Sequence, residues 1–227
     1  MPTREQEHVA ARREAFARLD RMRDHWWWRP GWQVGRSFYT FHVTFEDAPE
    51  VAKLAGYYRR ALDLPTLDPV PDEGLHLTMQ GIGFTDEVTE VEVNAIVGAA
   101  RARLAGLAPF DLTLGPADAD PEAVMLQVAP WAPLEQVRAA VRSAISDVSG
   151  DARVPDRADG FTPHVSVAYS GADAPAEPLR RRLAEIEPRA TTTRVTAVQL
   201  IDLNRDDQVY RWSTVATLGL GGAGTAD

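Results

Sequence analysis

A pattern of four residues, His-apolar-Ser/Thr-apolar, occurs at two places that read as β-strands: His76-Leu77-Thr78-Met79 and His164-Val165-Ser166-Val167. Side chains two residues apart on a strand project from the same face, so each tetrad pairs an imidazole with a hydroxyl while apolar residues pack behind them. Any alternating strand can contain one such tetrad. Two tetrads among only five histidines are hard to attribute to chance, and we treat them as candidate functional residues.

Two imidazoles facing each other across a cleft can act as general acid and general base, because an unperturbed histidine titrates at about pH 6.5. Thr78 and Ser166 would then donate hydrogen bonds to the non-bridging oxygens of a phosphate held between the imidazoles. These groups favour phosphodiester cleavage. A serine hydrolase needs an acid behind a histidine that faces the nucleophile, whereas each hydroxyl here shares a strand with its histidine. The sequence has no His-Glu-x-x-His or comparable metal motif, so we expect no metal.

A third tetrad, His42-Val43-Thr44-Phe45, complicates the count. Either it belongs to the site or its strand is only a neighbour of the two others. A predicted helix and a proline-rich loop separate it from the His76 strand. This separation favours the interpretation that its strand is only a neighbour of the two others. His42 therefore stays a candidate substrate contact.

Composition sets the limits of the fold and of its chemistry. The 227 residues, 44% of them hydrophobic, suffice for one domain or two closely joined lobes. No apolar run approaches 18 residues and the N-terminus begins with charged residues, so we expect a cytoplasmic monomer without membrane contact. The absence of cysteine excludes disulfides, Cys-ligated metal sites and a thiol nucleophile.

Charge is unevenly distributed along the chain. The net charge is −9, yet residues 1–36 contain eight arginines and five acidic residues, so the remainder carries −12. Such a body binds long nucleic acid poorly, because non-specific binding depends on neutralising phosphates. A small or single-ended phosphate ligand is compatible with it. Since Lys53 is the only lysine, phosphate contacts would fall largely to arginine.

The first 36 residues form an extension to the predicted domain. Apolar residues spaced by three, four or seven predict an amphipathic helix over residues 3–25. The residues of this stripe are Val9, Phe16, Leu19, Met22 and Trp26. Four tryptophans follow within residues 26–32, closed by a Pro-Gly turn. They either offer a platform on which bases stack or pin the helix to the domain, and burial of such large rings favours pinning. We expect a flexible tail over residues 219–227.

The remaining residues, 37–218, alternate between strand and helix patterns and form two similar halves, each with one of the two principal tetrads. A charged loop over residues 150–160 precedes the second tetrad. Strands are predicted over residues 37–45, 76–83, 110–114, 123–128, 193–203 and 209–218 and from residue 164, and helices over residues 48–62, 87–104, 134–148 and 178–186.

The two tetrads and their flanks resemble the 2H phosphoesterase superfamily, and in particular its 2′-5′ RNA ligase-like branch. The flanks are Leu75 and Gly83 around the first tetrad and Phe161-Thr162-Pro163 before the second. The resemblance covers about residues 37–218 and implies an α+β bilobal fold in which two antiparallel sheets face a central cleft and helices lie outside. It also implies His76 and His164 as the acid-base pair, with Thr78 and Ser166 orienting the phosphate.

The implied activity is metal-independent hydrolysis of 2′,3′-cyclic phosphates on RNA ends or small nucleotides to 2′-phosphates, without a cofactor. Some members also join or cleave 2′-5′ linkages. A non-catalytic nucleotide-binding or RNA-end-binding module is the alternative, as is an enzyme for another cyclic nucleotide such as ADP-ribose cyclic phosphate.

Two departures from the branch stand out. Its members often carry a basic residue shortly after the second tetrad, where this chain has Ala168-Tyr169-Ser170, so Tyr169 becomes a candidate substrate contact. Gly81 replaces a bulky residue found in many relatives. The N-terminal extension matches nothing in the common core.

Overall fold

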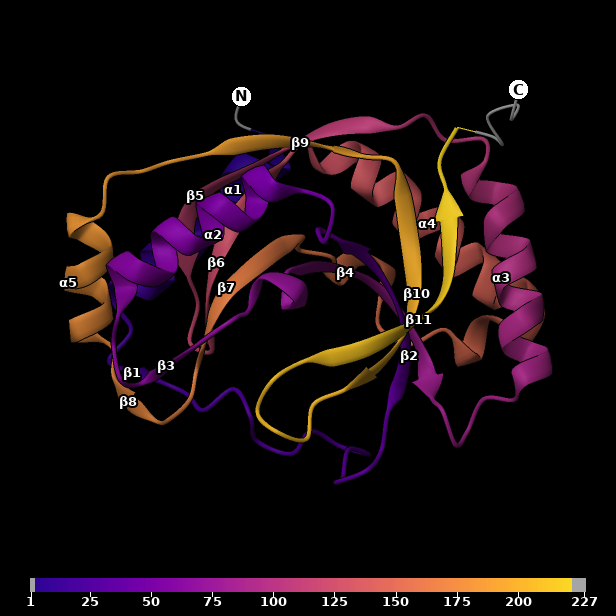
Figure 1. Cartoon of the computed structure of the whole chain (residues 1–227), viewed down its shortest axis with the longest axis horizontal. Helices are drawn as coiled ribbons and strands as arrows, with labels where there is room; N and C mark the ends of the chain where they lie inside the picture. Colours follow the sequence, from indigo (N-terminus) through magenta and orange to yellow (C-terminus); the bar gives the residue numbers. More distant parts are fainter. Residues whose placement is uncertain (1–2, 222–227) are drawn as a thin grey trace.

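Two antiparallel sheets form the two lobes of the chain, whose computed structural model describes residues 3–221 (Figure 1). The strands are β1 (Arg21–Met22), β2 (Phe38–Thr44), β3 (Leu67–Pro69), β4 (His76–Phe84), β5 (Phe110–Ala119), β6 (Ala123–Ala129), β7 (His164–Ser170), β8 (Ala174–Pro175), β9 (Thr191–Val195), β10 (Ala197–Asn204) and β11 (Arg211–Gly219). The helices are α1 (Arg4–Ala17), α2 (Pro49–Leu62), α3 (Glu90–Leu104), α4 (Trp131–Ser149) and α5 (Glu177–Glu185), with short 3₁₀ turns at Asp72–Gly74, Asp151–Arg153 and Ala158–Gly160.

One lobe contains a five-stranded sheet in the order β3-β7-β6-β5-β9, and the other a four-stranded sheet in the order β11-β10-β2-β4. Helices α2 and α5 contact each other on the first lobe, where α2 packs against β7 and β9, while α3 and α4 pack together on the second lobe against β11 and β4. Figure 1 shows the two pairs of helices at opposite ends of the molecule. Strands β4 and β7, which carry the two tetrads, contact each other where the lobes meet. The predicted bilobal α+β fold is confirmed.

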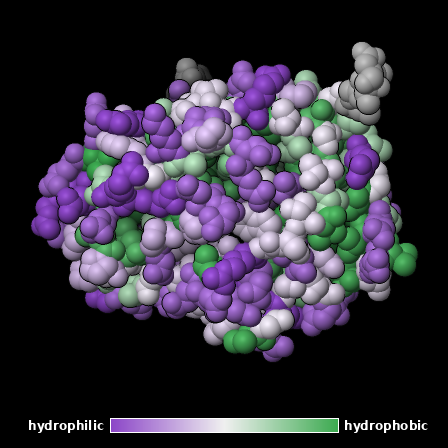
Figure 2. Space-filling model, in the orientation of Figure 1, coloured by the Kyte–Doolittle hydropathy of each residue, from purple (hydrophilic) through white to green (hydrophobic). Residues whose placement is uncertain are grey.

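Burial of periodic apolar side chains holds the helices on the sheets. In α2 the buried residues follow the spacing of one helical face. They are Val51, Leu54, Ala55, Tyr58 and Leu62. The surface in Figure 2 is mainly hydrophilic over α2 and α5 and more hydrophobic towards α3. No helix among residues 3–221 combines the length and the apolar content that crossing a bilayer requires.

The N-terminal helix is shorter than predicted. It ends at Ala17, and Phe16 is its one buried residue among those described. The chain then becomes extended, and Arg21–Met22 pairs with Ala174–Pro175 as a two-residue ladder. Met22 and Trp26, which we assigned to the helical stripe, are buried from this extended segment instead. Tertiary pairing thus overrides a pattern that also fits a helix.

The predicted hairpin over residues 110–128 has a shorter turn than expected. Strand β5 continues to Ala119, because residues 115 and 116 are accommodated by a shift of register between Leu114 and Ala117. Gly115 has φ of 96°, and a Cβ atom there would lie 2.4 Å from the carbonyl oxygen of Arg189. Glycine and proline therefore mark an irregularity within the strand rather than its end.

Three further boundaries differ from the predictions. Residues 193–203 divide at Thr196 into β9 and β10, which belong to different sheets. Helix α3 begins after Thr89, whose hydroxyl forms a capping box with Glu92, rather than at residue 87 as predicted. Strand β11 ends at Gly219, one residue beyond the predicted strand, and the next residue is buried. Residues 222–227 lie outside the described part of the chain.

The charged loop before β7 is fastened to α4. Arg138 is 7% exposed and donates from three nitrogens to the carbonyl oxygens of Met79, Arg157 and Ala158, at 2.8–3.0 Å. Arg142 adds bonds to the carbonyls of residues 155 and 156. One buried guanidinium thus joins the loop to the strand of the first tetrad.

We expect Arg138→Met to lower the free energy of unfolding by about 3 kcal/mol, because it leaves three carbonyls without their donor. Arg103→Met, which removes only an exposed ion pair with Asp147, should change it by less than about 0.5 kcal/mol. Urea denaturation of both variants measures the difference. Equal losses would contradict the role given to Arg138.

Candidate active site

The structure brings both tetrads to one cavity of about 440 Å³ between the lobes. The first tetrad begins β4 and the second begins β7, so each histidine stands at the first position of its strand. All six residues singled out in the sequence line the cavity: His42, His76, Thr78, His164, Ser166 and Tyr169. The volume lies within the range of about 300–1,000 Å³ that small-molecule sites occupy.

Both motif histidines are oriented by the same hydrogen bond. Nδ1 of His76 lies 2.8 Å from the carbonyl oxygen of Gly74, and Nδ1 of His164 lies 2.9 Å from that of Thr162. A carbonyl oxygen only accepts, so Nδ1 carries the proton in each imidazole. In the neutral ring Nε2 is therefore the unprotonated nitrogen, and it can take a proton from a bound reactant.

The surroundings keep both imidazoles neutral at pH 7. Burial lowers the pKa of His76 to about 4, with a smaller opposing effect of its bond to Gly74 and a further lowering by the charge of His164. Burial also lowers the pKa of His164, opposed by its bond to the Thr162 carbonyl. A bound anion would favour the protonated imidazole and raise these pKa values.

A β-bulge directs Tyr169 into the site. The pairing of β6 with β7 shifts register, so that Ser166 faces Met125 while Ala168 faces Val124, and Val167 is the extra residue. The bulge reverses the alternation, and Tyr169 joins His164 and Ser166 on the cavity side. Burial raises the pKa of Tyr169, so its hydroxyl is a neutral donor.

Similar shifts on β4 explain the unusual Gly81. The register of β2 with β4 skips Met79 and Ile82, which places Gly81 opposite Thr40 on the cavity side. A Cβ atom at residue 81 would lie 2.7 Å from the ring of Phe38. Phe38 therefore occupies the space that a larger residue 81 would need.

His42 is both a strand neighbour and part of the cavity. Strand β2 pairs directly with β4, so the long connection between them along the sequence does not separate them in space. The His42 ring stacks on His76 with centroids 4.4 Å apart, and its Nε2 lies 3.3 Å from Oγ1 of Thr78. Burial keeps the pKa of His42 well below its usual value.

Four of the cavity residues that sequence reasoning missed have basic or phenolic side chains. They are His25, Arg29, Arg205 and Tyr210. Two come from the N-terminal extension and two from the loop and strand edge between β10 and β11. The cluster of tryptophans was the one signal near them, and for Arg205 no residue pattern pointed to the site.

Residues 21–36, which we call the strap, cross from one lobe to the other. Near their start, the N–H of His25 donates to the carbonyl of Ser170 at the end of β7. Near their end, the N–H of Gly35 donates to Asp206 and Arg36 pairs with Asp86, both in the lobe of β4. Between these attachments, His25, Arg29 and Trp32 line the cavity.

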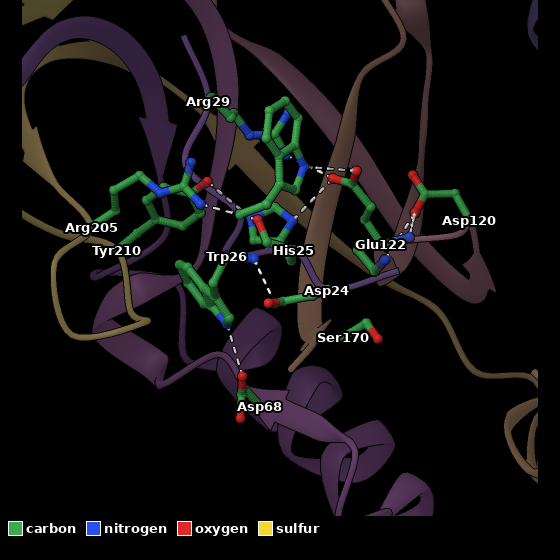
Figure 3. A network of polar contacts seen from close by, with 12 residues as sticks. Asp24, His25, Trp26, Arg29, Asp68, Asp120, Glu122, Ser170, Arg205 and Tyr210 are labelled. Atoms are coloured by element: carbon green, nitrogen blue, oxygen red, sulfur yellow. Dashed lines mark hydrogen bonds and ion pairs between the residues drawn. The ribbon is translucent and has the colours of Figure 1, made fainter. Parts of the chain in front are cut away.

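The tryptophans of the strap have different roles. Trp26 is buried and donates from Nε1 to Asp68 at 2.8 Å (Figure 3), and Trp32 packs against Phe84 with centroids 5.2 Å apart. These two anchor the strap, as the pinning interpretation predicts. Trp27 and Trp28 are 43% and 48% exposed.

Helix α1 packs on the cavity side of the five-stranded sheet. Across the ladder Asp118 faces Met125, and Met125 faces Ser166, so the three share a face. Nε of Arg12 on α1 lies 3.0 Å from the carboxylate of Asp118, and both side chains are nearly buried. The N-terminal extension therefore helps to form the cleft.

A family model for the 2′-5′ RNA ligase superfamily matches residues 46–207. The chain belongs to this superfamily of phosphoesterases. The strap and His42 precede the matched residues, whereas both principal tetrads lie inside them.

Solved structures share the fold of this chain. The protein TT0787 of Thermus thermophilus is 19% identical with a TM-score of 0.65, covering 82% of this chain and all of that one. LigT of E. coli complexed with NADP⁺ is also 19% identical, with a TM-score of 0.62 over 82% of this chain and 99% of that one. At this identity the likeness is one of fold. A comparison with curated protein sequences gives no match.

We expect the imidazoles of this superfamily member to titrate below pH 6.5, because burial lowers their pKa values. The His76 signals should change at about pH 4, as its pKa predicts. Nitrogen-15 NMR of the histidine rings measures both the midpoint and the tautomer, and Nδ1 of His76 and His164 should be the protonated nitrogen at pH 7. A His76 midpoint above pH 6.5 would contradict the assigned environment.

Proposed function

We propose that the protein hydrolyses 2′,3′-cyclic phosphates, on an RNA end or a small nucleotide, to 2′-phosphates and needs no metal for the reaction. The observation that carries the proposal is the pair of imidazoles on β4 and β7, each held through Nδ1 and each lining one cavity with its hydroxyl partner. Among residues 3–221, no group of three or more His, Asp or Glu side chains is arranged to hold a metal ion.

In the proposed reaction, Nε2 of one histidine takes a proton from water as the water oxygen attacks phosphorus. The bond from phosphorus to the 3′ oxygen breaks, and the other histidine, protonated at Nε2, gives that proton to the leaving oxygen. The product keeps the phosphate on the 2′ oxygen and carries a free 3′ hydroxyl. After the reaction the two histidines have exchanged protonation states.

The hydroxyls supply the electrostatic part of the mechanism. Thr78 and Ser166 can donate to the non-bridging oxygens, where negative charge grows as water attacks. For Thr78 this requires His42 to donate from Nε2, so that the threonine oxygen accepts and its proton stays free for the phosphate. His42 would then act as a positioning residue.

The walls of the cavity favour a terminal or small substrate. The strap forms one wall and is bonded to both lobes, so a long strand cannot continue through it. Solved structures of LigT from E. coli include complexes with 3′-AMP and with phosphate. Similar ligands suit a cavity lined by histidines, hydroxyls and arginines.

Hydrolysis of a nucleoside 2′,3′-cyclic phosphate in the presence of a chelator tests the proposal. We expect His76→Ala and His164→Ala each to reduce kcat by about 10³-fold or more, because each removes an acid-base group. His8→Gln, a half-buried histidine outside the cavity, is the matched control and should retain the wild-type rate.

Product analysis should give only the 2′-phosphate. Equal rates in all variants would refute the histidine mechanism, and loss of turnover with the chelator would indicate a metallohydrolase. Tight binding of an unchanged cyclic phosphate would identify a binding module instead.

The pH dependence of kcat/KM provides a separate prediction. The reaction needs one neutral and one protonated imidazole, and the protonated form is lost as the pH rises through its lowered pKa. We therefore expect kcat/KM to be greatest below pH 6.5 and to fall about tenfold per pH unit above the higher of the two pKa values. An optimum above pH 7 would be inconsistent with this mechanism.

A further inference from the structure

Arg205 is a buried arginine without a carboxylate partner. It lies in the loop after β10, is 3% exposed and lines the cavity. Its Nη2 donates to the carbonyl of His25 at 3.0 Å, while Nη1 has no hydrogen-bond acceptor among the described residues (Figure 3). No Asp or Glu of residues 3–221 lies within 4.0 Å of its nitrogens.

Aromatic rings hold the Arg205 guanidinium in place. Its Cζ lies 5.6–5.8 Å from the ring centroids of Trp26, Trp32 and Tyr210. These contacts attract a cation, but they replace only part of the hydration that burial removes. A fixed, buried guanidinium with a free hydrogen-bond donor is suited to binding an anion.

Arg138 shows what a purely structural buried arginine looks like in the same protein. Its exposure of 7% is close to that of Arg205, yet three backbone carbonyls accept its hydrogen bonds. Arg205 has one such carbonyl. The difference between two equally buried arginines therefore indicates that Arg205 lacks a partner that a ligand can supply.

Arg29 adds a second positive group on the same wall. Its Nη2 lies 2.7 Å from Oε2 of Glu122, whose other carboxylate oxygen accepts from Nε1 of Trp27. The other acidic residue nearby, Asp120, accepts the N–H groups of residues 122 and 123 with one oxygen. The carboxylates of this wall are thus engaged with protein donors, whereas Arg205 is not paired with any of them.

The arginine wall lies close to the histidine pair. The Tyr210 ring is 5.8 Å from the His76 ring, and Cζ of Arg205 is 5.7 Å from the same Tyr210 ring. The guanidinium therefore cannot lie farther from His76 than these two lengths combined. A nucleoside carries its 5′ oxygen on the other side of the ribose from its 2′ and 3′ oxygens, so phosphates on both sides can span two subsites.

We propose that Arg205, assisted by Arg29, binds a second phosphate of the substrate, attached to the 5′ oxygen of the nucleoside whose cyclic phosphate reacts at the histidines. The inference rests on the proposed function for the identity of the first phosphate. It names the substrate class more narrowly: a cyclic-phosphate nucleotide with a 5′ phosphoryl group, rather than a nucleoside with the cyclic phosphate alone. The 5′ phosphoryl group can be a terminal phosphate or the next linkage of an RNA end.

Binding of unreactive product analogues tests the subsite independently of turnover. Calorimetry on the wild-type protein compares a nucleoside 2′-phosphate with the corresponding 2′,5′-bisphosphate. We expect the bisphosphate to bind about tenfold more tightly or better, because an arginine-phosphate bond in a buried site is charge-assisted. A dinucleotide with a terminal 2′-phosphate forms the third arm, and its affinity distinguishes an RNA linkage from a terminal phosphate.

Arg205→Lys and Arg205→Gln should reduce the preference for the 2′,5′-bisphosphate over the 2′-phosphate to less than about threefold. The affinity for the 2′-phosphate should stay nearly unchanged. Arg29→Gln should reduce it in part, and it provides a less buried variant if Arg205→Gln fails to fold. Arg103→Gln, on the exposed side of α3, is the matched control and should keep the full preference.

Equal wild-type affinities for the mono- and bisphosphate would overturn the second subsite. A preference that survives both Arg205 substitutions would overturn the role of Arg205. If the protein binds these analogues as expected but hydrolyses no cyclic phosphate, the proposed function fails while the subsite stands.

Discussion

The chemistry of the site depends on one repeated hydrogen bond, from Nδ1 of a strand-initiating histidine to the carbonyl two residues earlier. This bond requires that the chain enter each strand in a fixed way. A 3₁₀ turn ending at Gly74 delivers the first carbonyl, and Pro163 restricts Thr162 to the extended backbone that delivers the second. With Nδ1 committed, Nε2 is the nitrogen free to exchange protons, and the burial that lowers the pKa values of both rings leaves it unprotonated.

Irregular strands adapt two ordinary sheets to this site. A regular β7 would direct His164, Ser166 and residue 168 to the cavity, and Tyr169 would point away. The extra residue at Val167 reverses this pattern, and the shift at Met79 on β4 does the same for Gly81. In each tetrad the histidine and the hydroxyl residue keep the regular alternation, and the fourth residue, Met79 or Val167, is the extra residue of a bulge that re-aims the side chains after it.

The sequence was sufficient to predict the tetrads and their strands, because these depend on alternation and spacing that local patterns express, and the resemblance to the superfamily implied the bilobal fold. It could not predict the strap. Leu19, Met22 and Trp26 satisfy a helical stripe as well as an extended segment, and only the pairing of Arg21–Met22 with Ala174–Pro175 decides between them. Bulges and the division of residues 193–203 between two sheets likewise depend on partners far away in the sequence. The role of Arg205 could not be predicted for the same reason, because the rings that pack around it, Trp26 and Tyr210, come from opposite ends of the chain.

The negative net charge of this protein does not by itself predict how it binds phosphates. The chain carries −9 overall, but the strap and the loop after β10 each place one arginine, Arg29 and Arg205, at the cavity. Burial, and then the charges of these arginines, lower the pKa of His25 to about 3, so this fourth cavity histidine stays neutral beside them. A net negative charge opposes accumulation along a polyanion, whereas one buried guanidinium acts over about the length of one nucleotide. The same charge distribution that weakens binding to long nucleic acid is therefore compatible with the proposed recognition of a single phosphorylated end.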